Sequence, residues 1–443
     1  MKKILALLLA FLVLLPLSLP ALAESEKDAI YNLNLDSQGV YVVNLESHTP
    51  IYQKAEDARM FPASTTKVMT ALVVLQNCKN PKKETITVKD PSAYSYIVED
   101  GGVHMEMKKG ETFTVYDLLV GLLLASYCDA ADLLAMHFGG GSIDKFVEMM
   151  NDTAKDLGLQ NTNFENPHGL HEKNHYSSPR DIALFTEEAL SYKTFRKIIS
   201  LRNYTIPQGK RQVRYTVNSF YPANKYYMDS YIGGKSGFTT EAGRCLVTVS
   251  EKDGASYISV LLGANLDGNR NYPDNMSWVE TYTLLNYAFE NYRLKSFAKK
   301  GKEVAKIPVK DSDEKLSVKT TEEIFLLSRK GSEPTYTLDI PKNIDAKKVK
   351  NKKEIGTLYP TWSGEQAKNG FPLALSWDGK PIATKSPIEK GAEHAAKAIS
   401  GIFREDRTFV TLFILLLLVI FICLPAYRIS QFLQNKKSHR PKH

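Results

Sequence analysis

The chain has 443 residues, of which 43% are hydrophobic and 24% are charged, and it carries a formal net charge of +8. These values are typical of a globular protein that is long enough for two domains. The lysines are scattered or lie after Arg293, and no nucleic-acid-binding motif accompanies them, so we expect no nucleic-acid partner.

The first 23 residues have the pattern of a secretory signal peptide. Met1–Lys3 is a positively charged segment, Ile4–Leu15 is apolar, and Ala21-Leu22-Ala23 is a small-x-small cleavage site. The alternative is an uncleaved anchor, but the apolar run is short and is broken by Pro16. We therefore predict that residues 1–23 are removed during export.

The C-terminal end predicts a membrane anchor. Residues 408–427 are almost wholly apolar and are long enough to cross a bilayer as a helix. The tail, 428–443, carries basic residues and no acidic one, so the positive-inside rule places it in the cytoplasm and the preceding chain outside. Residues 386–407 are predicted to be a juxtamembrane linker, either a plain helix or an amphipathic one on the membrane surface. We expect an exported, single-pass protein of the cell membrane.

Residues 24–292 alternate between strand and helix patterns. A strand pattern in residues 38–51 comes first, and apolar residues at helical spacing follow Ser64. Three further helices are predicted: 116–126, which follows the plausible cap Thr114; the amphipathic stretch 142–157; and a helix that begins at Ser178-Pro179.

Strand patterns return in residues 246–250 and 256–262, and Asp253-Gly254 between them is a strong hairpin signal. Residues 277–292 then read as a closing helix. Strands at both ends with helices between them predict an α+β domain with an antiparallel sheet over 24–292. Residues 293–385 contain short alternating segments separated by Pro and Gly, which predicts a small β-rich domain.

The cysteines do not form a disulfide framework. There are four in the chain, and one of them, Cys423, lies in the predicted membrane span. Cys78, Cys128 and Cys245 remain, without a C-x-x-C spacing, so we expect buried free thiols and no zinc or redox motif.

Pro62–Lys67 contains the strongest catalytic signal. Ser64 and Lys67 are three residues apart, which places them on one face of a helix, one turn from each other. A serine hydroxyl needs a base to remove its proton, and a lysine can be that base only if its pKa is depressed. Burial and a second cation, for which Lys235 is the candidate, both act in that direction.

Two later motifs add to this pair. Ser126-Tyr127-Cys128 follows the second predicted helix, and Lys235-Ser236-Gly237 lies before a strand pattern. The Lys235 ammonium and the Ser236 hydroxyl suit a substrate carboxylate, and Gly237 allows a substrate backbone to approach closely. Backbone amides at Ser64 and near Phe238 are candidates for an oxyanion hole.

Together these motifs resemble those of the D-alanyl-D-alanine carboxypeptidases, the low-molecular-weight penicillin-binding proteins of serine peptidase family S11. The resemblance covers about residues 37–292. It rests on three segments: Pro62–Leu72; Asn166–Leu170 with His175-Tyr176-Ser177; and Gly234–Thr239 with Glu241-Ala242-Gly243.

The resemblance implies a transpeptidase-like fold, an acyl-enzyme on Ser64, Lys67 as base, Ser126 as proton relay, and Lys235 with Ser236 on the substrate carboxylate. It also implies removal of the terminal D-alanine from peptidoglycan stem pentapeptides, acylation of the serine by β-lactams, a β-rich second domain and membrane attachment. No cofactor is implied.

Two residues depart from the family pattern. The family motif Ser-x-Asn reads Ser126-Tyr127-Cys128 here, so a weakly bonding thiol replaces an amide at a predicted substrate contact. The family's Lys-Thr-Gly reads Lys235-Ser236-Gly237, which keeps the hydroxyl. His168, His171 and His175 have a spacing that invites a metal site, but the family places such a loop without metal, and we predict none.

Three alternatives stay open. The Cys128 departure leaves room for a catalytically weak peptidoglycan-binding or regulatory protein. Cleavage of cross-links by a D,D-endopeptidase is a close relative of the main hypothesis. A β-lactamase is disfavoured, because the chain lacks an evident E-x-x-L-N element.

Overall fold

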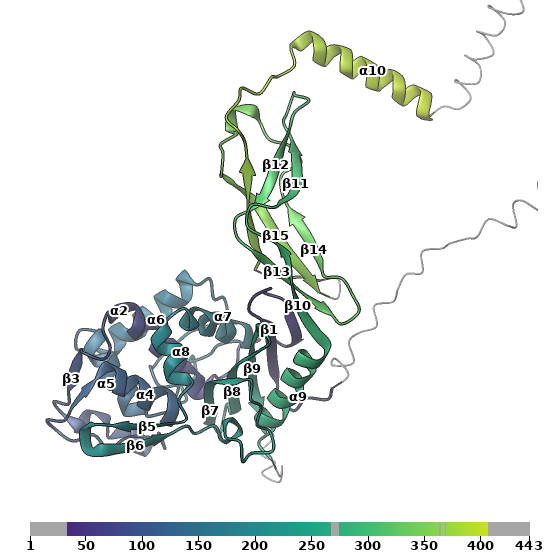
Figure 1. The fold of residues 1–443 in the computed structure, drawn as a ribbon. Coiled ribbons are helices and arrows are strands. Elements are labelled where there is room, and N and C mark those ends of the chain that lie inside the picture. The colour runs from purple at the N-terminus through teal and green to yellow at the C-terminus, as the bar shows by residue number, and fades with distance from the viewer. Residues whose placement is uncertain (1–32, 267–273, 363–364, 368, 406–443) are drawn as a thin grey trace, which may run out of the picture. The chain divides into compact units, whose positions relative to one another are not determined.

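The computed structural model describes residues 33–266, 274–362, 365–367 and 369–405 (Figure 1). The predicted signal peptide, membrane span and basic tail lie outside these residues and stay predictions. Within the described ranges, no helix is both long and apolar enough to cross a membrane.

The chain divides into two compact units. One comprises the residues up to Lys302 together with Thr320–Asp339 and Thr357–Pro372, and the other comprises Glu303–Lys319, Ile340–Gly356 and the residues from Leu373 onward. The predicted boundary after residue 292 is not tested by this division.

The first unit contains a five-stranded antiparallel sheet with the order β2-β1-β9-β8-β7. Its strands are β1 (Gly39–Asn44), β2 (Pro50–Lys54), β7 (Tyr231–Thr239), β8 (Gly243–Lys252) and β9 (Ala255–Ala264). Asp253 and Gly254 join β8 to β9 with φ values of 53° and 79°, the left-handed pair that a tight hairpin requires, so the hairpin prediction is confirmed. Because β7 stands at the end of the sheet order, one of its edges has no strand partner in this sheet.

Helices cover both sides of this sheet, with α9 on one side and α7 and α8 on the other, and α2 packs against α7 and α8 (Figure 1). The helices are α2 (Lys67–Asn77), α3 (Tyr96–Glu99), α4 (Val115–Val120), α5 (Cys128–Phe138), α6 (Ile143–Asp156), α7 (Pro179–Leu190), α8 (Lys193–Ile199) and α9 (Met276–Asn291). Short 3-10 turns are η2 (Ala63–Thr66), η3 (Pro91–Tyr94), η5 (Gln208–Lys210) and η6 (Asn218–Phe220), and the small hairpins are β3 (Thr85–Thr87) with β4 (Thr112–Thr114) and β5 (Asn203–Ile206) with β6 (Arg211–Arg214). The α+β prediction is confirmed.

Side chains before the helices cap their first turns, and those of Thr114 and Ser178 do so as the sequence predicts. Ser142 accepts the Lys145 amide at the start of α6, and Ser178 accepts the Asp181 amide at the start of α7, where Pro179 is the first residue. Thr114 forms a reciprocal capping box with Asp117.

The helix predicted over 116–126 is interrupted. α4 passes into a π-helix, η4 (Gly121–Ala125), and Ser126 ends it in the left-handed region with φ 66°. The Tyr127 ring packs on the helix at Gly121, where a Cβ would lie 2.8 Å from it. The missing side chain lets that ring pack against the helix, while the Tyr127 amide donates to the Gly121 carbonyl.

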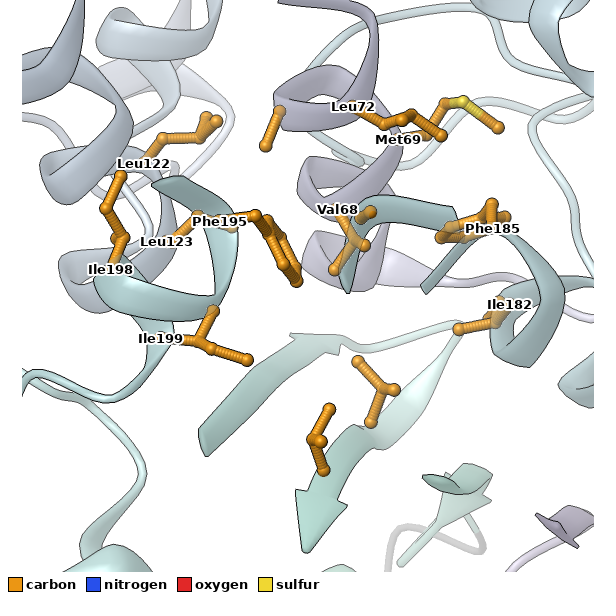
Figure 2. Close-up of a cluster of buried hydrophobic side chains, with 14 of the residues drawn as sticks. Val68, Met69, Leu72, Leu122, Leu123, Ile182, Phe185, Phe195, Ile198 and Ile199 are labelled. Carbon is orange, nitrogen blue, oxygen red and sulfur yellow. The ribbon is translucent and has the colours of Figure 1, made fainter. Parts of the chain in front are cut away.

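The core between the sheet and the helices is formed by fully buried aliphatic and aromatic side chains (Figure 2). Figure 2 shows Val68, Met69 and Leu72 of α2 in one cluster with Phe185 of α7 and Phe195 of α8. The sequence's apolar positions after Ser64 therefore lie in this core, which anchors the helix that begins at Lys67.

A β-rich domain follows. It comprises β10 (Tyr292–Ala298), β11 (Glu303–Pro308), β12 (Lys315–Thr320), β13 (Ile324–Arg329), β14 (Thr335–Asp339), β15 (Glu354–Trp362), β16 (Glu365–Gln366), β17 (Phe371–Ser376) and the short turn η7 (Ala346–Lys348). β10 pairs with β13, and a second sheet has the order β11-β12-β17-β15-β14 with β16 on β15. The predicted β-rich character is confirmed. Helix α10 (Pro387–Glu405) covers the predicted linker.

Candidate active site

Ser64 and Lys67 lie together as the spacing predicts. Ser64 is in η2, Lys67 is the first residue of α2, and Lys67 Nζ is 2.8 Å from Ser64 Oγ. Lys67 is fully buried, with 0% exposure, whereas Ser64 is partly exposed. A buried amine therefore contacts a hydroxyl that remains open to a substrate.

Burial dominates the electrostatics of Lys67 and lowers its pKa. The Cys128 thiol and the carboxyl groups of Asp132 and Asp129 act in the opposite direction. Lys67 Nζ also donates to the backbone carbonyl of His168 at 2.6 Å, which fixes the amine over Ser64. A lysine with a lowered pKa and a fixed position is suited to take a proton from the serine.

Cys128 lies against the same amine. It is the first residue of α5 and is 2% exposed, and its Sγ is 3.4 Å from Lys67 Nζ and 3.8 Å from the Ser126 carbonyl oxygen. The thiol therefore keeps a contact with the lysine. Cys128 thus contacts both the Ser126 backbone and Lys67. Among the described residues, the Ser126 hydroxyl has no hydrogen-bond partner. Its role as a proton relay stays a prediction.

Lys235 and Ser236 lie on the edge strand β7. Lys235 is fully buried, and its Nζ donates to the Ser236 carbonyl at 2.6 Å. Burial, and after it the charge of Lys67, hold the pKa of Lys235 well below its usual value. The Ser236 hydroxyl is partly exposed and lies 3.5 Å from Thr216 Oγ1.

Gly237 and Phe238 continue the strand past the serine. A Cβ at Gly237 would lie 2.7 Å from the Ser64 nitrogen, so β7 and η2 meet in direct backbone contact. Phe238 is 61% exposed, and the Arg244 guanidinium lies over its ring at 5.3 Å. The sequence places Lys235-Ser236-Gly237 before a strand pattern, whereas the structure has them within strand β7. These predicted site residues and the Ser64–Lys67 pair form one site.

The loop 166–175 closes the site from another side. Gly169 has φ +81°, and a Cβ there would lie 2.0 Å from the Ala63 carbonyl oxygen. His175 Nε2 is 2.8 Å from Thr66 Oγ1, and Thr70 Oγ1 donates to the Pro167 carbonyl at 2.5 Å. These contacts attach the loop to η2 and α2, which carry Ser64 and Lys67.

The three histidines of this loop have separate contacts. His168 Nδ1 accepts the Leu170 amide, His175 Nδ1 accepts the Glu165 amide, and the exposed His171 stacks edge-on against Phe61. Burial lowers the pKa of His175 to about 3. In the part of the chain that the structure describes, no three metal-ligating side chains gather.

Sequence reasoning missed the residues behind Lys67. Asp132 of α5 is fully buried, and the Tyr96 hydroxyl donates to its Oδ2. A signal was present, because Asp129 and Asp132 are acids one turn apart in an otherwise apolar run of helix. Their link to Lys67 depends on a loop and a short helix that no spacing rule connects to them.

The fold and the Ser64–Lys67 pair together define a serine hydrolase of the Ser-x-x-Lys type. Residues 24–266 match the family model described as D-alanyl-D-alanine carboxypeptidase, Peptidase S11. The chain belongs to this family, and its activity class is that of a serine-type D-Ala-D-Ala carboxypeptidase.

Individual relatives agree. The chain is 31% identical to the D-alanyl-D-alanine carboxypeptidase DacF of Bacillus subtilis over 402 residues, which are 88% of this chain and 95% of the relative. Penicillin binding protein 5 from Haemophilus influenzae matches with TM-score 0.65 and 25% identity, over 79% of this chain and 98% of the other. The Streptomyces K15 DD-transpeptidase matches with TM-score 0.52 and 30% identity, over 58% of this chain and 98% of the other.

Proposed function

We propose that this carboxypeptidase acts through an acyl-enzyme on Ser64, with Lys67 as its general base. The observation that carries the proposal is the 2.8 Å contact between Ser64 Oγ and the buried Lys67 Nζ. Neutral Lys67 takes the Ser64 proton as the oxygen attacks the scissile carbonyl, and the proton leaves with the departing amine. Water then hydrolyses the ester and frees Ser64.

The substrate is proposed to lie along the edge strand β7. Its terminal carboxylate is held by the Lys235 ammonium and the Ser236 hydroxyl, and Ser126 passes a proton to the leaving group. The scissile carbonyl then lies beside Gly237, where no side chain blocks it, and the amides of Ser64 and Phe238 are the candidate oxyanion donors. The close contact between Gly237 and the Ser64 nitrogen supports this placement.

We propose peptidoglycan stem pentapeptides as the substrate, with release of their terminal D-alanine, and β-lactams as covalent inhibitors at Ser64. The test is D-alanine release from diacetyl-Lys-D-Ala-D-Ala by the full chain in mild detergent, with Ser64→Ala as the control. Release that Ser64→Ala abolishes is the expected result. A folded protein that binds the peptide without releasing D-alanine would favour the peptidoglycan-binding alternative.

A second candidate is transfer of the acyl group to an amine rather than to water. It is favoured by the 30% identity to a protein named as a DD-transpeptidase. The 33% identity over 222 residues to a D-alanyl-D-alanine endopeptidase of Pseudomonas aeruginosa favours the related cleavage of cross-links. Adding glycine as acceptor tests the first, because transfer gives a glycine-terminated peptide, and a cross-linked dimeric peptide as substrate tests the second.

We also propose that the enzyme works outside the cell membrane and is anchored by residues 408–427. The signal-peptide pattern in residues 1–23 and the basic tail after the apolar span support this orientation. Protease added to intact cells should digest the main body and leave a short C-terminal fragment in the membrane. Recovery of the whole chain in the soluble fraction would contradict the anchor.

A further inference from the structure

A buried acid lies behind the proposed base, in contacts that the reaction scheme does not use. Asp132 has 0% exposure, the Tyr96 hydroxyl donates to its Oδ2, and its Oδ1 has no hydrogen-bond partner among the described residues. An ionised carboxylate with an unpartnered buried oxygen is costly, so its position calls for an explanation.

His168 connects this acid to Lys67. His168 Nδ1 accepts the Leu170 amide, so its proton lies on Nε2, which is 3.1 Å from the Tyr96 oxygen and 3.7 Å from Asp132 Oδ1. The backbone carbonyl of the same residue accepts Lys67 Nζ at 2.6 Å. One residue therefore contacts the acid–tyrosine pair with its ring and the proposed base with its backbone.

We propose that Asp132, held by Tyr96 and His168, is a positioning residue that places the His168 carbonyl and sets the proton affinity of Lys67. The inference rests on the proposed function, in which Lys67 is the base. When Asp132 is ionised, its negative charge favours the ammonium form of Lys67 and opposes catalysis. When it is neutral, Lys67 loses its proton more readily.

Burial favours the neutral form, because it raises the pKa of Asp132 to about 7, against the Tyr96 hydrogen bond and the charge of Lys67. Other charged and titratable groups also face the two residues. Around Lys67 they are Cys128 and Asp129 of α5, Lys235 of β7, and His168 and His175 of the loop; around Asp132 they are Tyr94, Tyr96, Asp129 and His168.

The test is the pH dependence of kcat/KM for D-alanine release, and of Ser64 acylation by penicillin, in the full chain. Both rates rise as Lys67 loses its proton in the free enzyme. Asp132→Asn removes the fraction of Asp132 that is ionised at the pH where Lys67 titrates, so the acid limb of the pH profile should move to lower pH by up to about one unit. In Tyr96→Phe the ionised carboxylate loses a donor, so the limb should move in the same direction by less.

The matched control is Glu280→Gln. Glu280 is a buried carboxylate of α9 that accepts the Ser37 hydroxyl, remote from the catalytic pair, and its variant should leave the limb in place. If Asp132→Asn does not fold, the shift of the acid limb in Tyr96→Phe is the test of the inference. Lower maximal rates with an unmoved limb would show a merely structural role and overturn the inference. Absence of any Ser64-dependent reaction in the unchanged protein would overturn the proposed function and this inference with it.

Discussion

Gly237 and Ser64 are in backbone contact across the site: a Cβ on Gly237 would lie 2.7 Å from the Ser64 nitrogen and 2.8 Å from Ala63 Cβ. Neither neighbour is the flexible end of a side chain, so neither can yield easily. The edge strand and the nucleophile's turn are thus kept at a separation that only glycine permits at this position.

Gly237→Ala should therefore push β7 away from Ser64 and lower kcat/KM by about 10²-fold, because a shift of about 1 Å is enough to misplace reacting groups. Steady-state D-alanine release measures the loss. Gly391→Ala is the control, since a Cβ there meets nothing within 4 Å. A Gly237→Ala enzyme of normal rate would show that β7 has no part in placing the substrate.

Replacing Cys128 by asparagine should raise turnover. The thiol is 3.4 Å from Lys67 Nζ, where it is a poor hydrogen-bond partner, and an amide in its place has both a stronger acceptor and a donor for the substrate. One such contact is worth about 1.4 kcal/mol, or about tenfold in kcat. Cys128→Ala should show no increase in turnover, because alanine supplies neither the acceptor nor the donor. An unchanged or lower rate in Cys128→Asn would contradict our interpretation of this departure.

Binding of a substrate carboxylate should take up protons. Burial and the charge of Lys67 hold the pKa of Lys235 well below its usual value, and a carboxylate bound beside it favours the charged form again. Calorimetry of peptide binding to Ser64→Ala, in buffers with different ionisation enthalpies, measures the uptake. A peptide with an amidated C-terminus should bind weakly and without uptake, and equal heats for the acid in all buffers would count against Lys235 as its partner.

The stability of Asp132→Asn relative to the unchanged protein should depend on pH. Burial raises the pKa of Asp132 from 3.8 to about 7, so between these values the folded state binds the proton more tightly than the unfolded state does. The unchanged protein therefore loses stability as pH rises through this window, and asparagine does not.

In urea unfolding, the free energy of unfolding of Asp132→Asn relative to the unchanged protein should rise by about 2–3 kcal/mol between pH 5 and pH 8. The exposed Asp152→Asn should show no such trend. If the difference in the free energy of unfolding between Asp132→Asn and the unchanged protein did not vary with pH, the Asp132 carboxyl would ionise as readily in the folded as in the unfolded chain.

Much of the fold was predictable because its signals are local. Ser142 and Ser178 accept the amides that cap residues accept, and Asp253-Gly254 adopts the left-handed pair that its hairpin needs. The contact between Ser64 and Lys67 also follows from a spacing within one helical turn. Cys78, Cys128 and Cys245 are free and buried, as predicted.

The remainder depends on contacts between distant segments. The π-helix at Gly121–Ala125 begins where the Tyr127 ring packs against Gly121, a contact that helical periodicity does not reveal. The link from Asp132 to Lys67 joins residues from α5, α3 and a loop, so it emerges only when the chain is folded. The position of Asp132 in the sequence does not reveal which residues surround its side chain in the fold.

The contact between Gly169 and Ala63 limits how the site can be redesigned. A Cβ at position 169 would lie 2.0 Å from the Ala63 carbonyl oxygen, so a mutational library that varies this position would mostly sample enzymes with a displaced nucleophile. His171, Glu172, Lys173 and Asn174 are exposed on the same loop. An engineer who wants new substrate preferences should keep position 169 constant and diversify this four-residue tip.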